Sequence, residues 1–196
     1  FRVKTAEGLE RALKRQLRFI ARQYGMELEE GEYYDLFTDL IFEMSAGGRV
    51  VVLIDEYDKP LLDNIDNLEE AKEIREVLRG FYTVLKSMDE YIHFILLTGV
   101  SKFSKAGVFS GPNNLTDITL HPRYATLLGI TQEELEAFFA DHLTALAAES
   151  GMSRREILDE IRRWYDGFRF APEAEQVYNP YSLLMFFFTG RFDNYW

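Results

Sequence analysis

The sequence predicts an α/β fold that contains a parallel sheet and is followed by a helical region. Two apolar runs indicate strands, "VVVLI" at residues 50–54 and "IHFILL" at residues 92–97. A stretch with helical spacing lies between them, from about residue 68 to 88. Strand, long helix and strand in this order predict a right-handed crossover that joins parallel strands. Because the first run is continuous rather than alternating, we expect the sheet to be buried on both faces.

Two further helices are predicted ahead of the first strand. Residues 5–24 carry apolar side chains at helical spacing with Lys and Arg between them, and Thr5 is a suitable N-cap. A second helix is expected over about 31–45, where it stops before a pair of glycines.

Three more helices are predicted after the sheet. Thr131 with Glu134, and Ser153 with Glu156, form two capping boxes that start helices over about 131–148 and 153–165. Asn179 followed by Pro180 starts the third. We therefore expect a core over residues 1–130 and a helical region over 131–196.

Composition narrows the classes of function. The chain has 196 residues, 22 Lys and Arg against 33 Asp and Glu, and a net charge of −11, which argues against a broad surface for a polyphosphate backbone. Cysteine is absent, so the sequence holds no disulfide framework and no thiolate zinc site. No apolar run approaches the ~20 residues of a membrane span. These features favour a cytoplasmic protein without a membrane partner.

Acidic and hydroxyl side chains follow the two predicted strands. Asp55 and Glu56 come directly after the first strand, and Thr98 and Ser101 follow the second. Parallel strands would bring all four to one edge of the sheet, where open α/β sheets bind their ligands. The alternative is a capped strand end with solvated acids, because an apolar run that ends in Asp-Glu is common by chance.

The pattern of aliphatic residues followed by Asp-Glu is that of the Walker B element of P-loop ATPases. Asp55 would then bind Mg²⁺ or orient its waters, Glu56 would orient the attacking water, and Thr98 would contact the γ-phosphate. A P-loop should accompany this element, yet none of the 13 glycines is followed by Lys. The loop is either supplied by sequence ahead of Phe1 or the protein is not an ATPase.

Four ordered motifs resemble the AAA-ATPase-like domain of many bacterial and archaeal proteins. They are "VVVLIDEYDKPLLDN", "FILLTGVSKFSKAGVFSGPNNLTDITLHPRYATLLGIT", "IRRWYDGFRF" and "VYNPYSLLMFF". The resemblance implies a P-loop NTPase-like core whose P-loop part precedes this chain, with Asp55 and Glu56 as the Walker B acids and Thr98 to Ser101 in the sensor-1 position. It also implies a helical lid, and a nuclease-like domain of the PD-(D/E)XK type after it.

Two functions follow from this resemblance. In the first, the parent protein is a Mg²⁺-dependent ATPase, and this chain supplies the half that activates water. In the second, it is a nucleotide-dependent switch or interaction module that does not hydrolyse ATP and acts on a nuclease-like partner domain. Nucleic acid would be reached only indirectly, and an exposed sheet edge would favour self-association.

Arg123 is the remaining site candidate. It would contact the γ-phosphate as a lid or trans-acting arginine, or it would form a salt bridge with one of the 33 acids. The role of the loop-rich segment 99–130 is open.

Overall fold

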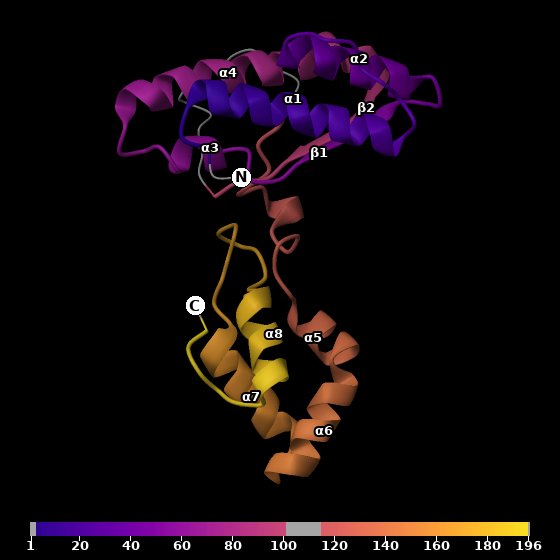
Figure 1. Ribbon diagram of the computed structural model, residues 1–196. Helices are drawn as coiled ribbons and strands as arrows, with labels where there is room; N and C mark the ends of the chain where they lie inside the picture. Colours follow the sequence, from indigo (N-terminus) through magenta and orange to yellow (C-terminus); the bar gives the residue numbers. More distant parts are fainter. Residues whose placement is uncertain (1–2, 101–114, 196) are drawn as a thin grey trace. The chain divides into compact units, whose positions relative to one another are not determined.

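Helices and a two-stranded parallel sheet make up the first of two compact units in the computed structural model, which describes residues 3–100 and 115–195 (Figure 1). The first unit covers Phe1–Leu115 and the second covers Thr116–Trp196. The compact units therefore divide at residue 115. The boundary expected at residue 130, between the core and the helical region, stays a prediction.

The sheet confirms the parallel pairing expected from the sequence. Strand β1, Val50–Ile54, pairs with β2, Ile92–Leu97, in parallel. The register runs from Val50 opposite Ile92 to Ile54 opposite Leu97, with one irregularity between Val50 and Val51. The carboxyl ends of both strands therefore lie at the same edge.

The helices of the first unit form close to the predicted ranges. They are α1 (Ala6–Gln23), α2 (Tyr33–Ser45), α3 (Lys59–Leu62) and α4 (Leu68–Ser87), with a short 3₁₀ turn at Asp89–Tyr91. The Thr5 side chain accepts a hydrogen bond from the Gly8 amide, which confirms it as the N-cap of α1. Helix α3 has no counterpart in the sequence-based assignment.

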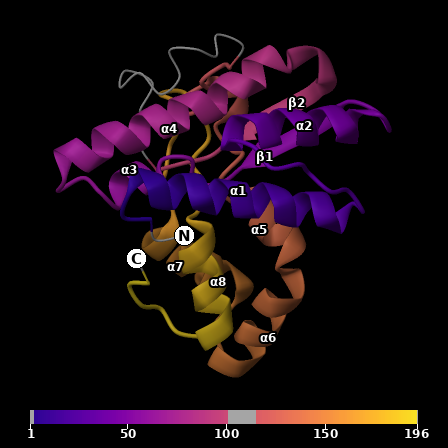
Figure 2. The ribbon, with the colours of Figure 1, turned by 45° about the horizontal axis from the view of Figure 1, so that its top comes forward.

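Helices α1, α2 and α4 cover one face of the sheet. Val52 and Ile92 are buried with the apolar faces of these helices, and Val50 and Ile54 pack against the same cluster. Figure 2 shows the three helices side by side over the strands. The crossover helix α4 contributes seven buried side chains to this core, among them Ile74 and Leu85.

The expectation that both sheet faces are buried is wrong for the described chain. On the face away from the helices, Val51, Leu53 and Phe94 are 50%, 68% and 51% exposed. Residues 50, 52 and 54 alternate with 51 and 53, and only the first set meets a layer of helices. The continuous apolar run makes both faces of the strand suitable for burial. The helices of the first unit bury one of these faces.

The second unit contains helices α5 (Gln132–Phe138), α6 (Ala140–Ser150), α7 (Arg154–Tyr165) and α8 (Pro180–Thr189), and a 3₁₀ turn at Pro122–Tyr124. Both predicted capping boxes are present, and Asn179 caps α8 ahead of Pro180. The predicted helix over 131–148 is interrupted at Phe139, whose backbone departs from helical geometry and separates α5 from α6.

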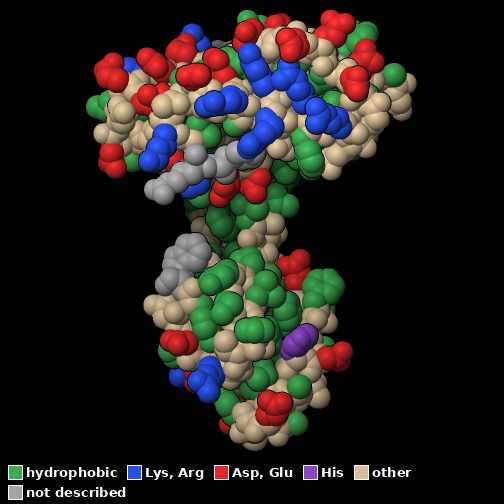
Figure 3. All heavy atoms as spheres, viewed as in Figure 1, with side chains coloured by type: hydrophobic (Ala, Val, Ile, Leu, Met, Phe, Trp, Pro, Cys, Tyr) green, Lys and Arg blue, Asp and Glu red, His purple; other side chains and the backbone are tan. Residues whose placement is uncertain are grey.

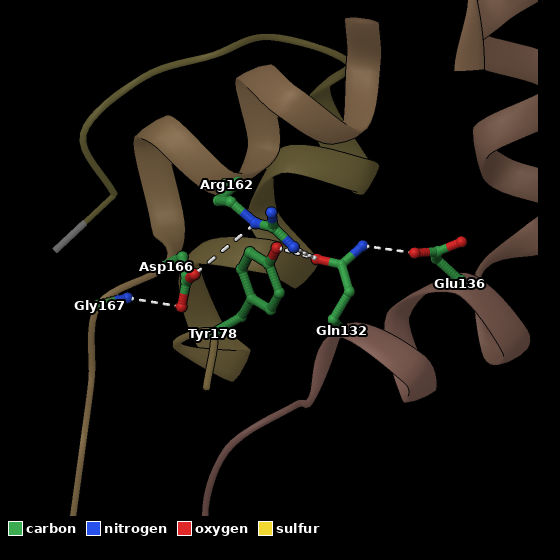
Figure 4. Close-up of polar contacts among 6 residues, drawn as sticks. All are labelled: Gln132, Glu136, Arg162, Asp166, Gly167 and Tyr178. Atoms are coloured by element: carbon green, nitrogen blue, oxygen red, sulfur yellow. Dashed lines mark hydrogen bonds and ion pairs between the residues drawn. The ribbon is translucent and has the colours of Figure 1, made fainter. Parts of the chain in front are cut away.

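A polar network joins α5, α7 and the segment before α8 (Figure 4). The Gln132 side-chain oxygen accepts hydrogen bonds from Arg162, at 3.1 Å, and from the Tyr178 hydroxyl. Burial raises the pKa of Tyr178, so the phenol stays protonated as the donor. Behind this network, Leu135, Leu143, Ile161 and Phe186 form the core of the unit.

Among the described helices, none combines the length and apolarity required to cross a membrane.

The one-sided sheet predicts effects of very different size for the same substitution at two adjacent residues. Val52→Lys, at a 9% exposed position, should lower the free energy of unfolding by about 3 kcal/mol or more, because it buries an unpaired charge. Leu53→Lys, at a 68% exposed position, should change it by less than about 1 kcal/mol. Denaturant unfolding followed by circular dichroism measures both. Equal destabilisation would contradict an uncovered face.

Candidate functional site

The backbone ladder between β1 and β2 continues past the last paired residues. The Thr98 amide donates to the Ile54 carbonyl at 2.9 Å, and the Tyr57 amide donates to the Thr98 carbonyl at 2.9 Å. Parallel pairing therefore fixes the backbone on both sides of Asp55 and Glu56. The two carboxylates lie on a backbone segment that is held at both ends.

Asp55 and Thr98 are in direct contact. The Thr98 hydroxyl donates a hydrogen bond to Asp55 Oδ1, and the Glu56 amide donates to the same oxygen at 3.0 Å. Within the described residues, Asp55 Oδ2 accepts no hydrogen bond, and the side chain is exposed. One carboxylate oxygen thus fixes the side chain, and the other is available to a ligand.

Glu56 has a left-handed backbone. Its φ is 52°, the only positive value found for a residue other than glycine in the described chain. Residues with a Cβ adopt this conformation infrequently, and the strain costs on the order of 1 kcal/mol. The neighbouring turn is closed by the Lys59 amide, which donates to the Glu56 carbonyl at 3.0 Å. The Glu56 side chain is exposed and makes no ion pair with the described residues.

The loops that follow the two strands lie unusually close to each other. A Cβ placed on Gly99 would lie 2.7 Å from Asp58 Oδ1 and 2.7 Å from Tyr57 Cε1, which no side chain tolerates without a shift. Asp58 is 1% exposed although it is an acid. Glycine at position 99 therefore permits a contact that holds the second strand end against the first.

Tyr82 of α4 makes a hydrogen bond to the loop that carries this contact. Its hydroxyl donates to the Tyr57 carbonyl at 3.3 Å, and its side chain is 2% exposed. Burial raises the pKa of the Tyr82 phenol well above its ordinary value of 10.0, and the nearby Tyr57 and Asp58 raise it further. The crossover helix thus supplies a neutral donor beneath the loop that bears the acids.

Two predicted site residues stay predictions. Ser101 lies outside the described residues. Arg123 belongs to the 3₁₀ turn of the second unit, where its amide donates to His121 Nδ1 at 3.2 Å. Lys59, near the acids in sequence, pairs with Asp63 at 2.9 Å. Asp55, Glu56 and Thr98 are therefore the predicted residues that the structure brings together.

The chemistry of these groups fits a magnesium ion with few protein ligands. Mg²⁺ is commonly held by one or two carboxylates and keeps several waters or phosphate oxygens. Asp55 Oδ2 offers one such ligand, and Glu56 is adjacent. The described residues contain no cluster of three or more His, Cys, Asp or Glu that would enclose a metal by itself. The sequence also contains no Gly-Lys pair to cradle phosphates.

Sequence reasoning did not identify Asp58, Gly99 and Tyr82 as supports of the site. A glycine directly after a strand-end threonine was a usable signal of close backbone approach. Burial of Asp58 had no such signal, because an acid in a turn usually faces solvent. The position of Tyr82 depends on how α4 packs beneath the strands.

The Gly99 contact predicts a strong size limit at that position. Gly99→Ala should lower the free energy of unfolding by about 1–3 kcal/mol, because the new methyl group meets Asp58 and Tyr57. Gly47→Ala is the matched control, since the nearest atom to its Cβ would be 4.0 Å away. Urea unfolding compares the two. Equal small effects would show that the loops are not in contact.

The pKa of Tyr82 predicts a loss of stability in alkali. Below pH about 10 the phenol is protonated in both folded and unfolded chains, so its contribution is complete. As pH rises further, the unfolded chain loses this proton first and the free energy of unfolding falls. Tyr82→Phe should lower stability by about 1 kcal/mol at neutral pH and flatten the alkaline decline. Tyr24→Phe, at a 65% exposed position, is the control and should leave the decline unchanged.

Comparisons with known proteins place the chain in a family. Residues 1–109, more than half of the chain, match the AAA-ATPase-like family model, described as a predicted AAA-ATPase. A protein of Azotobacter chroococcum mcd 1, described as an uncharacterized protein in the vnfD 5' region, is 42% identical over 196 residues. The alignment covers 99% of this chain and 36% of that relative, so the chain spans about a third of its length. No solved structure matches the chain. The chain belongs to the AAA-ATPase-like family.

Proposed function

We propose that the edge formed by Asp55, Glu56 and Thr98 is the Walker B and sensor part of a Mg²⁺-dependent ATPase. The observation that carries this proposal is the parallel strand pair, which joins Thr98 to Asp55 by a side-chain hydrogen bond. Membership in a family described as a predicted AAA-ATPase supports the same chemistry. The activity is proposed for the longer protein, because the chain holds no phosphate-binding loop.

Asp55 is the proposed metal ligand. Oδ1 is occupied by the Thr98 hydroxyl and the Glu56 amide, and these contacts orient Oδ2. Mg²⁺, when bound there with ATP, would neutralise charge on the triphosphate. Without a cation, the paired acids would repel the nucleotide, so binding of ATP should depend on the metal.

Glu56 is the proposed water-orienting residue. Its carboxylate is exposed, forms no hydrogen bond within the described chain, and can accept a proton from an attacking water. Its left-handed backbone supports a functional role, because glycine or asparagine would adopt this geometry at lower cost. A strained backbone at Glu56 is consistent with a requirement for the carboxylate side chain at this position.

Thr98 is proposed as the residue that senses the γ-phosphate. In the structure its hydroxyl donates to Asp55, so contact with a phosphate requires the hydroxyl to turn. Ser101 and Arg123 are proposed as further nucleotide contacts from the loop-rich segment. Arg123 would act on the γ-phosphate as a lid arginine.

Two observations favour the second function, a nucleotide-dependent switch that does not hydrolyse ATP. The Thr98 donor is already satisfied by Asp55, and the chain has no cradle for phosphates of its own. In that reading, nucleotide binding exchanges the Thr98 partner and changes how the protein acts on a nuclease-like domain. A cytoplasmic location and self-association through the sheet edge belong to both readings as proposals.

Turnover of ATP by the longer protein separates the two readings. For an ATPase, Glu56→Gln should bind ATP with Mg²⁺ but lose about 100-fold or more in kcat, because water is no longer activated. Thr98→Val should also slow turnover, whereas Thr98→Ser, which keeps the hydroxyl, should retain most of it. Glu43→Gln on α2, an exposed acid away from the strand ends, is the control.

A malachite green assay for phosphate and a fluorescent ATP analogue provide the two measurements. Full turnover in Glu56→Gln would reject the role of Glu56. Tight nucleotide binding with no turnover in the unmodified protein would support the switch. If ATP does not bind at all with Mg²⁺ present, both readings fail.

A further inference from the structure

Most of helix α1 carries basic side chains and no acidic ones, although the chain is acidic overall. Between residues 11 and 22 the sequence contains five of the chain's 22 Lys and Arg residues and no Asp or Glu. The whole chain has a net charge of −11. The charge of this helix therefore differs from that of the chain as a whole, in which acids outnumber bases.

Four arginines of α1 form one stripe, which we call the arginine stripe: Arg11, Arg15, Arg18 and Arg22. Their spacing of four, three and four residues places them on one side of the helix. At a rise of about 1.5 Å per residue the stripe is about 17 Å long. Phosphates on one nucleic-acid strand recur about every 3.4 Å along a duplex axis, so the stripe spans about five of them.

The opposite side of α1 is already used. Leu9, Leu17 and Ala21 are buried in the core of the first unit. An amphipathic helix that binds a membrane must insert its apolar side into the lipid. Because α1 has committed that side to the core, its basic side can take part only in contacts to charged or polar partners.

Three arginines of the stripe form no ion pair with an acid in the described chain. Lys14 pairs with Glu32 at 2.8 Å, but no described carboxylate pairs with Arg11, Arg18 or Arg22. A shallow surface groove runs along the helix between these side chains, and Glu7 and Glu10 also line it, nearer the start of the helix. Figure 3 shows the Lys and Arg side chains gathered on this face of the first unit, with most of the acids towards its margins.

An aromatic side chain lies among the basic residues of this groove. Phe19 is 54% exposed and lines the groove together with Arg15, Arg18 and Arg22. A phenylalanine that is half exposed between arginines has no core to fill. Cationic grooves with exposed aromatic rings are typical of proteins that bind single-stranded nucleic acid, because the cations follow the backbone and the ring stacks on a base.

We propose that α1 binds single-stranded nucleic acid, with the arginine stripe on the phosphates and Phe19 stacked on an unpaired base. The interior of a duplex and acidic protein segments offer the negative charge but not an accessible base face. The site is separate from the Asp55 edge and does not depend on ATP hydrolysis. It adds a direct contact to a chain for which only indirect access to nucleic acid was expected.

The test measures binding of the chain to a labelled single-stranded DNA of about 20 nucleotides by fluorescence anisotropy. The triple variant Arg11→Gln, Arg18→Gln, Arg22→Gln should weaken binding roughly ten- to hundredfold near 0.1 M salt. The slope of log Kd against log salt should fall by about 2, because three phosphate contacts are lost. Phe19→Leu should weaken binding roughly tenfold and leave this slope unchanged.

A control of equal charge change shows whether position matters. Lys72→Gln, Arg75→Gln, Arg79→Gln on α4 also removes three positive charges, from a helix whose cations pair with Glu69 and Glu76. It should bind the DNA nearly as well as the unmodified chain. Circular dichroism confirms that each variant is folded, and the single change Arg18→Gln replaces the triple variant if that one does not fold.

Three results would overturn the proposal. The first is no anisotropy change with the unmodified chain at low salt. The second is equal weakening by the α1 and α4 variants, which would indicate a response to net charge alone. The third is undiminished binding by Phe19→Leu together with equal binding to polyglutamate or to anionic vesicles, which would assign the stripe to acidic peptides or lipid headgroups.

Discussion

The hydrogen-bonded pairing of β1 with β2 is the constraint on which the candidate site depends. Only a parallel arrangement brings the ends of two strands, 43 residues apart at Asp55 and Thr98, to the same edge. The ladder then continues through the Thr98 and Tyr57 amides, so the acids are positioned by backbone bonds rather than by flexible side chains. An antiparallel pair would have separated the two groups, and neither the carboxylates nor the hydroxyl alone would then suggest a common ligand.

Much of this arrangement could be predicted because its signals are local. Three such signals mark where an element begins or ends, and the structure confirms them. They are the β-branched run ending at Ile54, the N-cap at Thr5 and the capping box at Thr131. The exposed outer face of the sheet was missed because an apolar run indicates that a strand is suited to burial, not which layer is present. The left-handed backbone of Glu56 had no signal, because glutamate is not a residue that favours it. How Arg123 relates to the acids stays a prediction, since it depends on tertiary placement.

The first unit carries two opposite electrostatic features. At the ends of β1 and β2, carboxylates are concentrated where a cation would be needed to bring in a triphosphate. On α1, arginines gather on a helix whose other side is buried in the core. The two proposals assign these features to different ligands, a metal–nucleotide and a polyanion. Their separation within a chain of net charge −11 explains why overall charge alone describes neither.

The near-contact at Gly99 has a mechanical consequence. With no side chain at that position, the backbone after β2 rests directly on Asp58 and Tyr57, and Tyr82 braces the latter from α4. The loops that follow β1 and β2 are thus in close contact. A displacement of Gly99 toward the first loop would therefore require Asp58 and Tyr57 to shift as well. The position of the peptide that carries the paired acids thus depends on the course of the chain directly after β2.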